Sequence, residues 1–328
     1  MKAVHIKEFG DLENLDLADI PEPPPPSGTQ VLVRIRAAGL NRADLLQVKG
    51  RYPAPPGYSS NIPGLEFAGE VVQFGDAVKS FSKGDRVMAI AAGHAQSEFV
   101  ISDASVLSKI PDNLGFTEAA AIPEAFITAH DAVFTQCGLT AGESLLVHAV
   151  GSGVGLAALQ MAKAASATVI GTSRTADKLE RCKEFGLDVG IATENEPEFS
   201  KAVMEATEGR GADVILDLVG ASYFKESLAS AALKGRIALV GLTGGATAEF
   251  NLGVALSKRL KMLGTVLRAR ATEEKAAATE AFASFALPLF ESGAIRPNVD
   301  RVFPAEDVKE AYRYLASNAS FGKVVLEF

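Results

Sequence analysis

The feature that most constrains the fold of this chain is an alternation of strand and helix patterns between residues 144 and 242. A short apolar run, Ser144–Ala149, is followed by Val154–Ala165, where apolar residues have helical spacing. The alternation recurs at Ala167–Thr172 and Asp177–Phe185, at Asp213–Val219 and Tyr223–Ala232, and at Arg236–Leu242. Strands that are apolar along their whole length and separated by helices indicate a doubly wound parallel sheet. We expect Lys261–Leu267 to be its last strand.

Residues 1–122 follow a different pattern, with short β-like runs between glycines and prolines. These runs are Val31–Ala37, Glu66–Phe74, Arg86–Ala91 and Ala95–Ile101. Their spacing predicts an antiparallel, β-rich domain. The tail has helix patterns at Glu273–Ser292 and Ala305–Ser317 and a last strand at Gly322–Phe328. Because the β-rich part has few helices to cover its sheet, we expect the tail to pack onto it.

A chain of 328 residues exceeds the size at which one hydrophobic core keeps growing, so two domains are expected. We predict one domain from residues 1–122 and 268–328, and a second domain from residues 123–267.

Composition excludes several classes of protein. Hydrophobic residues make up 48% and charged residues 22%, as in ordinary globular chains, and the net charge of −8 disfavours a nucleic-acid or anionic-membrane partner. Two cysteines, Cys137 and Cys182, cannot build a disulfide framework and are interpreted as structural. The sequence shows no signal peptide and no apolar stretch that could span a bilayer, so we expect a cytoplasmic protein.

A glycine-rich turn, His148–Gly155, lies where the first strand of the alternating segment meets its helix. Such a turn lets the backbone approach a pyrophosphate and directs free helix N–H groups at its oxygens. The spacing is not a strict GxGxxG. If Gly155 is the last glycine of the motif, Val150 and Ser152 occupy the first two glycine positions, and Gly151 and Gly153 each follow one residue later. Its place in a series of strand–helix–strand units nevertheless predicts a dinucleotide site. The alternative is a purely structural turn.

The end of the next strand predicts which dinucleotide is bound. An NAD site has a carboxylate there for the ribose 2′-hydroxyl, whereas this chain has Ser173 and Arg174, with Lys178 close behind. These side chains can donate hydrogen bonds to a 2′-phosphate, and the two cations can add charge. NADPH is therefore favoured over NADH. The alternative is that the two cations are ordinary solvated charges.

Other catalytic patterns are missing from the sequence. None of the four histidines is spaced with a cysteine or a second histidine as zinc ligands usually are. There is no GxSxG elbow and no GxxxxGK[ST] phosphate loop, which argues against a hydrolase of that type and a P-loop enzyme.

Several segments in order, together with the glycine turn, carry a resemblance to a known family: Ala38–Asp44, Gly50–Gly57, Ile62–Gly69, Ala121–Ala129 and Gly322–Leu326. The whole chain resembles the zinc-independent quinone oxidoreductases of the medium-chain dehydrogenase/reductase superfamily, and within them the stress-inducible NADPH:quinone oxidoreductase type. The resemblance implies an α/β protein with a GroES-like β-rich catalytic domain and a Rossmann doubly wound parallel-sheet domain. It also implies a homodimer, joined through an edge strand such as Lys261–Leu267.

The resemblance also implies an enzyme without a metal. Asn41 stands where the zinc-dependent relatives have a cysteine ligand, and Leu65, before Glu66, where they have a histidine. We predict NADPH-dependent reduction of quinones or related activated enones by direct hydride transfer, with Asn41, Asp44 and Tyr52 as catalytic residues. Tyr52 would stack on the acceptor or donate a proton.

The predicted cofactor-binding residues come from several points along the chain. They are Thr128, Gly151, Ser152, Gly153, Val154, Ser173, Arg174, Lys178, Val219, Gly241, Leu242 and Lys323. Two other functions remain open at this point: an enoyl-thioester reductase on the same fold, and an NADPH-binding sensor or structural protein with little turnover.

Overall fold

The computed structural model describes residues 1–194 and 198–328, which form two compact units. Unit 1 consists of Met1–Ile127 with Leu267–Phe328, and unit 2 of Thr128–Val266. Each unit has its own sheet. The predicted boundary after residue 122 differs from the observed one, because Glu124 and Phe126 make contacts within unit 1. The backbone N–H of Glu124 donates to the Glu66 carboxylate at 2.8 Å, and the ring of Phe126 packs on Phe290.

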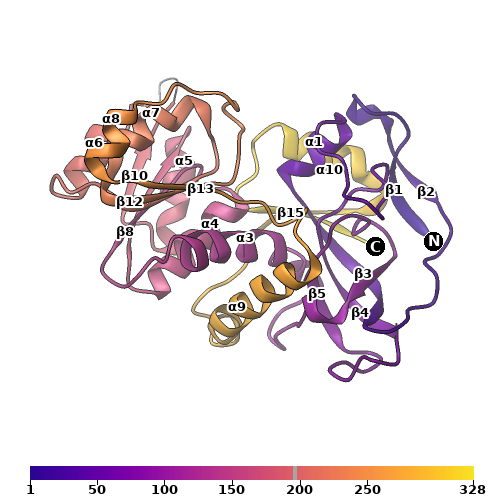
Figure 1. The fold of residues 1–328 in the computed structure, drawn as a ribbon. Helices are drawn as coiled ribbons and strands as arrows, with labels where there is room; N and C mark the ends of the chain where they lie inside the picture. Colours follow the sequence, from indigo (N-terminus) through magenta and orange to yellow (C-terminus); the bar gives the residue numbers. More distant parts are fainter. Residues whose placement is uncertain (195–197) are drawn as a thin grey trace. The chain divides into compact units, whose positions relative to one another are not determined.

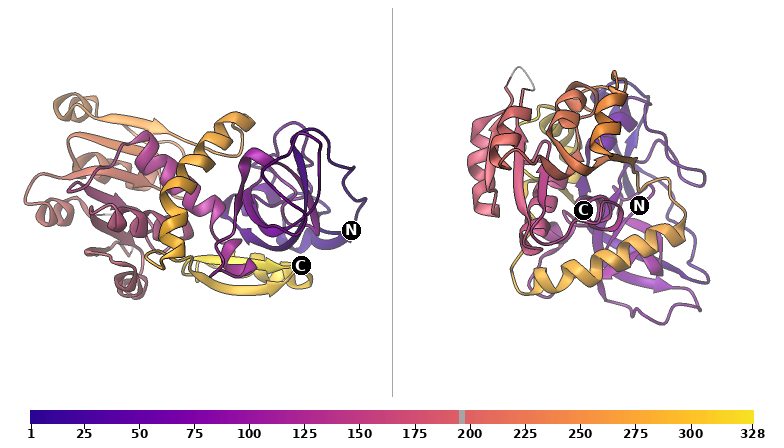
Figure 2. Two further views of the ribbon diagram at one scale, coloured as in Figure 1. Left: turned by 90° about the horizontal axis from the view of Figure 1, so that it is seen from below. Right: turned by 60° about the vertical axis from the view of Figure 1, so that its left-hand side comes forward.

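Unit 1 contains a seven-stranded sheet in the order β14-β15-β3-β4-β5-β7, with β6 also paired to β3. The sheet strands are β3 (Gln30–Leu40), β4 (Glu66–Phe74), β5 (Arg86–Ile90), β6 (Phe99–Asp103), β7 (Leu107–Lys109), β14 (Val299–Pro304) and β15 (Lys323–Glu327). Strands β1 (Lys2–Ile6) and β2 (Leu15–Asp19) form a separate antiparallel pair. The C-terminal strand β15 pairs antiparallel with β3, so the tail packs on the N-terminal part as predicted (Figure 2).

The helices of unit 1 are few. They are the α-helices α1 (Arg42–Val48), α2 (Phe116–Ala119), α9 (Thr272–Glu291) and α10 (Val308–Ala316), the π-helix η3 (Pro123–Ile127), and the 3₁₀ turns η1 (Leu12–Asn14), η2 (Ala104–Val106) and η6 (Ala305–Asp307). Helix α10 packs its apolar face on a core cluster that includes Leu40, Leu45 and Val324. These contacts link α1, β3 and the C-terminal strand, which carry polar residues described below.

One predicted strand of unit 1 is displaced. The prediction was Ala95–Ile101, but β6 begins at Phe99. The preceding residues bond to other segments: the Gln96 N–H donates to the Pro63 carbonyl and the Glu98 N–H to the Lys2 carbonyl. An alternating apolar pattern marks extended backbone, and the tertiary structure decides which partner that backbone has.

Unit 2 is a six-stranded parallel sheet in the order β10-β9-β8-β11-β12-β13, as the alternating pattern predicts. Its strands are β8 (Ser144–Val147), β9 (Thr168–Ser173), β10 (Val189–Ala192), β11 (Ala212–Asp217), β12 (Ala231–Leu239) and β13 (Lys261–Gly264). Its helical segments are α3 (Thr128–His130), η4 (Asp131–Gln136), α4 (Gly153–Ala164), α5 (Ala176–Cys182), η5 (Lys183–Phe185), α6 (Ser200–Ala206), α7 (Ala221–Ser230) and α8 (Leu252–Lys258). Figure 1 shows α6, α7 and α8 on one side of this sheet and α3 and α4 on the other.

The core of unit 2 lies between the sheet and its helices, and includes Ile170, Ile215, Phe199, Leu228 and Ile237. His148 is buried in it, between the Thr172 and Ser227 hydroxyls at 3.0 and 2.9 Å. Burial lowers the pKa of this imidazole to about 3, so His148 is a neutral core residue.

Two predicted elements of unit 2 have different ends. Helix α7 runs from Ala221 to Ser230 rather than to Ala232, because Ala231 already pairs with Ala212 in the sheet. Strand β12 accordingly runs from Ala231 to Leu239, whereas the prediction was Arg236–Leu242. Among the described residues, no helix is both long and apolar enough to cross a membrane.

Candidate active site

Unit 1 gathers polar side chains around the end of β3. Asn41 follows this strand and precedes α1, and its side chain is partly exposed. Its amide Nδ2 donates to Glu66 Oε1 at 2.8 Å, and its Oδ1 accepts from Lys323 Nζ at 2.6 Å. A longer bond of 3.4 Å joins Nδ2 to the carbonyl of Gly39. Both ends of the Asn41 amide are therefore oriented by charged groups.

Lys323, at the start of β15, is buried in this cluster with only 5% of its surface exposed. Its Nζ lies 2.6 Å from Glu66 Oε1, 2.6 Å from Asn41 Oδ1 and 2.7 Å from the carbonyl oxygen of Leu40. An ammonium group has three protons, and these three acceptors match them. Cofactor binding by Lys323 stays a prediction, since this geometry directs its ammonium into the cluster.

Glu66 is completely buried on β4. Besides its two bonds through Oε1, its Oε2 accepts the backbone N–H of Glu124 at 2.8 Å. A side chain at Gly39 would interfere, because a Cβ there would lie 2.3 Å from Glu66 Oε1 and 2.6 Å from the Ala120 carbonyl. The absence of a side chain at Gly39 thus leaves room for the buried carboxylate of Glu66.

Asp44 lies beneath Asn41 in the first turn of α1 and is completely buried. Its Oδ2 accepts the backbone N–H of Asn41 at 2.8 Å and the amide of Gln96 at 3.3 Å. Its Oδ1 has no hydrogen-bond partner among the described residues. Burial raises the pKa of Asp44 to about 6. Asp44 was predicted to be catalytic; its carboxyl is buried and bonded to the Asn41 backbone, so a catalytic role for Asp44 stays a prediction.

Tyr52 is partly exposed and lies over a cation that the sequence analysis missed. The Arg268 guanidinium carbon is 4.9 Å from the centre of the Tyr52 ring, a cation–π distance. Arg268 is 4% exposed and donates to the backbone carbonyls of Ala92 and Tyr52 and to Gln47 Oε1. Burial first, and then the charge of Glu124, raise the pKa of Tyr52 above its ordinary value.

Glu124 is the second residue that the sequence analysis missed. It is the second residue of η3, and its side chain is partly exposed. Burial, followed by the negative charge of Glu66, raises the pKa of Glu124 to about 8. Glu124 belongs to Ala121–Ala129, a segment quoted for the family resemblance, so its position was visible in the sequence. Its environment was not, because Glu66 and Arg268 come from distant segments.

In unit 2, the glycine turn joins β8 to α4. Ser152 caps α4, with its hydroxyl accepting the Gly155 N–H at 3.1 Å. Gly155 has no room for a side chain, since a Cβ would lie 2.6 Å from the carbonyl oxygens of Ala149 and Val150. The turn therefore places Gly153 and Val154 in the first turn of a twelve-residue helix, whose N–H groups suit a phosphate.

Three predicted cofactor contacts lie at or after the end of β9, whose last residue is Ser173. Ser173 is buried, and its hydroxyl accepts the Thr175 N–H at 3.3 Å. Arg174 is exposed, and Lys178, in α5, is partly exposed. The two cations are thus accessible while the Ser173 hydroxyl is buried, and their role in binding a 2′-phosphate stays a prediction.

Four further predicted residues of unit 2 lie near strand ends or in a helix. After β11, Asp217 Oδ1 accepts the N–H groups of Val219 and Gly220, each at 2.8 Å. The Gly241 N–H donates to the carbonyl of Asp217 at 3.2 Å, so the turns after β11 and β12 are adjacent. Leu242 is 57% exposed there, and Thr128 is buried in α3, between the π-helices η3 and η4.

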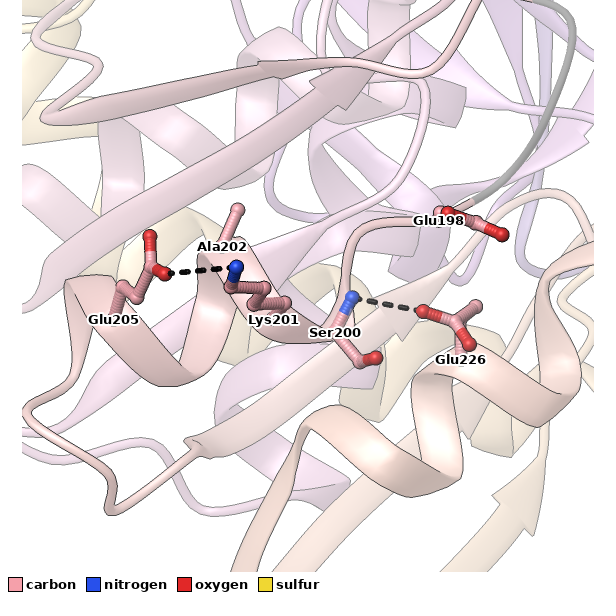
Figure 3. Close-up of a pocket in the computed structure, with 6 residues that line it drawn as sticks. All are labelled: Glu198, Ser200, Lys201, Ala202, Glu205 and Glu226. Carbon is pink, nitrogen blue, oxygen red and sulfur yellow. Dashed lines mark hydrogen bonds and ion pairs between the residues drawn. The ribbon is translucent and has the colours of Figure 1, made fainter.

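A surface hollow of about 410 Å³ lies elsewhere on unit 2 (Figure 3). It is lined by residues of α6, by Glu198, which precedes this helix, and by Glu226 of α7. The Glu226 carboxylate accepts the backbone N–H of Ser200 at 2.9 Å, and Lys201 lies 4.0 Å from Glu205. These interactions support the start of α6 and a solvated helix face, and the hollow includes none of the predicted site residues.

Comparison with protein families gives two matches. Residues 27–134 match an alcohol dehydrogenase GroES-like domain, and residues 153–284 match a zinc-binding dehydrogenase family. Among curated proteins, the chain is 31% identical over 333 residues to a quinone oxidoreductase of Lama guanicoe, covering 99% of this chain and 97% of the relative. It is 32% identical over 305 residues to quinone oxidoreductase-like protein 2 of Mus musculus, covering 92% and 86%.

Solved structures are similar over their whole length. A Pseudomonas syringae quinone oxidoreductase has a TM-score of 0.88 at 29% identity and covers 100% of this chain and 99% of that one. A mycobacterial protein complexed with NADPH has a TM-score of 0.87 at 30% identity, with full coverage of both chains. The JamJ enoyl reductase has a TM-score of 0.86 at 30% identity and covers 99% and 98%.

The name of one matched family raises the question of a zinc site. Zinc is held by thiolate, imidazole or carboxylate ligands. In the Asn41 cluster, Glu66 Oε1 and Asn41 Oδ1 already bind the ammonium of Lys323. Within residues 1–194 and 198–328, no group of three or more histidine, cysteine, aspartate or glutamate side chains could hold a metal ion. The donor set of this cluster does not fit zinc.

Proposed function

The chain belongs to the medium-chain dehydrogenase/reductase superfamily, and on that premise we propose that it reduces quinones or related activated enones with NADPH, by direct hydride transfer and without zinc. The observation that carries the proposal is the cluster of Asn41, Glu66 and Lys323. The ion pair of Lys323 with Glu66 fixes the partly exposed amide of Asn41, which can donate a hydrogen bond to an acceptor. Electrostatic stabilisation of a reduced acceptor is the main requirement of this reaction.

The predicted residues of unit 2 would hold the cofactor. The first turn of α4, with Ser152, Gly153 and Val154, would bind the pyrophosphate, and Ser173, Arg174 and Lys178 would bind the 2′-phosphate. When bound, the nicotinamide supplies a hydride to the acceptor. The proposed set in unit 2 is completed by Gly151 in the glycine turn, by the turns at Val219, Gly241 and Leu242, and by the side chain of Thr128.

The residues of unit 1 would act on the acceptor. The Asn41 amide donates to Glu66 at 2.8 Å, whereas its bond to the Gly39 carbonyl is long at 3.4 Å, so its second proton is weakly held and available to an acceptor oxygen. Lys323 and Glu66 keep the amide in that orientation. The ring of Tyr52, supported from below by Arg268, offers a flat surface for a quinone.

A cofactor exchange tests the assignment of the phosphate site. The triple variant Ser173→Asp, Arg174→Ala and Lys178→Ala should weaken NADPH binding by ~10-fold or more for each lost charge-assisted bond, with a smaller effect on NADH. Dissociation constants would be measured by cofactor fluorescence. Lys201→Ala, which removes an exposed lysine of the same unit, is the control. Equal losses for both cofactors would refute the assignment.

The acceptor class is tested by NADPH oxidation with 1,4-benzoquinone, an ortho-quinone and crotonyl-CoA. We expect turnover with the quinones. The structural similarity to an enoyl reductase favours one second candidate, and oxidation with the thioester alone would select it. Tight NADPH binding without oxidation would instead identify a sensor or structural protein. Chelators should leave the activity intact, and chelator inhibition reversed by added zinc would overturn the metal-free proposal.

A homodimer through β13 is part of the proposal. This strand lies at the edge of the parallel sheet (Figure 1), and the neighbouring helix α8 exposes Leu252 and 80% of Leu256. Met262, on the strand itself, is also exposed. Pairing of two edges would cover this apolar surface and satisfy the strand's free backbone groups. Analytical ultracentrifugation should find a dimer that Leu256→Glu weakens, and a monomeric wild type would exclude it.

A further inference from the structure

The polar side chains at the unit 1 site fall into two layers. Asp44, Glu66 and Lys323 are buried, with exposures between 0% and 5%. Asn41, Tyr52 and Glu124 are partly exposed. A small molecule bound at this surface can touch only the second layer. Among the described carboxylates of the cluster, Glu124 is thus the one that can reach an acceptor.

The backbone of Glu124 is held firmly while its carboxyl is not paired. Its N–H donates to Glu66 Oε2 at 2.8 Å, which fixes the start of η3 on the cluster. Within residues 1–194 and 198–328, no hydrogen bond or ion pair of at most 4.0 Å engages its side-chain oxygens. A carboxyl with a fixed backbone and no protein partner is free to give its proton to a ligand.

The charges around Glu124 come from every segment packed near it. They are Glu66 on β4, Asp44 on α1, Lys323 on β15, Arg268, Lys275 on α9 and the phenol of Tyr52. Lys323, the ion-pair partner of Glu66, already donates to three acceptors, and Arg268 donates to three others. Burial and the nearby carboxylates therefore favour the neutral acid, with a pKa of about 8.

We propose that the carboxyl of Glu124 is the catalytic acid that supplies the proton to the reduced acceptor. The inference rests on the proposed function. The acceptor gains an electron pair with the hydride, which leaves an oxyanion on a quinone or an enolate on an enone. The O–H bond of Glu124 then breaks, and a new O–H or C–H bond forms on the product. The Glu124 carboxylate regains its proton from solvent, so one proton is consumed for each acceptor reduced.

Tyr52 is the competing proton donor, as the sequence analysis suggested. Burial and the charge of Glu124 both raise the pKa of its phenol, so Tyr52 is a weaker acid here than in water. General acids act best when their pKa lies near the working pH. The structure therefore divides the roles, with Glu124 supplying the proton and the Tyr52 ring, over Arg268, positioning the acceptor.

The kinetic test compares Glu124→Gln with the wild type, using NADPH and 1,4-benzoquinone. The glutamine keeps the size and loses the acid, so kcat should fall by ~100-fold or more, while the dissociation constant of NADPH stays within about twofold. In the wild type, kcat should decline as the pH rises above about 8, because the acid ionises; this decline should be absent in Glu124→Gln. Glu280→Gln, an exposed glutamate of α9, is the matched control.

Two readouts separate this inference from the proposed function and from misfolding. Infrared difference spectra between pH 7 and pH 10, without cofactor, should show a protonated carboxyl that Glu124→Gln removes and Glu280→Gln retains. A Glu124 carboxyl already ionised at pH 7, or a Glu124→Gln variant with normal kcat and an unchanged pH profile, would overturn the inference. Failure of the wild type to oxidise NADPH with any quinone would refute the proposed function instead. Glu124→Asp should keep the decline with pH at a reduced rate, which a purely structural role would not produce.

Discussion

Replacing Lys323 by methionine would test how far a buried ion pair organises the unit 1 site. The Lys323 and Glu66 side chains are 6% and 0% exposed, and their charged atoms are 2.6 Å apart. In Lys323→Met, Glu66 keeps its bonds to Asn41 and Glu124 but loses its countercharge. Removing one partner of a buried pair typically costs about 3–5 kcal/mol, since the remaining charge stays in a poorly solvating interior.

This loss should be visible as a lower unfolding temperature. For a unit of this size, about 3–5 kcal/mol corresponds to a decrease in Tm of roughly 6–20 °C. The double variant Lys323→Met with Glu66→Gln removes both charges and should be more stable than Lys323→Met alone. Lys201→Met is the control, because Lys201 is exposed and its distance to Glu205 is 4.0 Å.

Calorimetry and urea unfolding of the wild type, Lys323→Met, Glu66→Gln, the double variant and Lys201→Met would give the free energies of unfolding. A decrease below ~1 kcal/mol for Lys323→Met would refute the reasoning, because it would mean that Glu66 is well solvated without its partner. A double variant whose loss equals the sum of the two single losses would refute it as well, since the two charges would then be independent.

Two other predictions concern the same cluster. Gly39→Ala should destabilise unit 1 by about 1–3 kcal/mol or more, because its Cβ would lie 2.3 Å from Glu66 Oε1. Urea midpoints would measure this, with Gly264→Ala, where a Cβ meets nothing within 4 Å, as the control; equal midpoints for both would contradict it. Burial raises the pKa of Asp44 to about 6, so between pH 4 and 6 the folded protein binds a proton that the unfolded chain has lost. Stability should therefore fall as the pH rises through this range, by roughly 3 kcal/mol for Asp44 alone. Asp44→Asn should remove that part of the slope, and parallel pH curves for the two proteins would disprove the assignment.

Much of the fold could be predicted because its signals are local. The strand Glu66–Phe74 has the predicted ends, and the unit 2 strands follow apolar runs that the sequence shows directly. The glycine turn could be recognised because a strand, a turn and a helix are contiguous in the chain. The errors lie at ends such as Ala95 and Ala231, where hydrogen bonds to distant segments decide where a strand begins.

The candidate site was less predictable. Asn41 and Tyr52 could be named from the resemblance, but Arg268 lies outside the segments that carry it, and Glu124 lies inside one of them with nothing local that reveals its environment. Arg268 matters because it is buried under Tyr52, and Glu124 because its backbone is bonded to Glu66. Asp44 was predicted as a catalytic residue and that role stays a prediction, while its burial beneath Asn41 depends on the packing of Gln96 and α10.

The amino-acid order by itself determined the strand–helix alternation, the glycine turn before α4 and the cationic end of β9, since each depends on residues that are neighbours in the chain. Only the tertiary structure decided which charges are buried and which are accessible. Lys323, Asn41 and Glu66 come from three separate strands or their ends, and they meet because β15 pairs with β3 and β3 with β4. Solvation and charge pairing depend on such distant contacts, so the protonation of Glu124 and Asp44 follows from the folded arrangement.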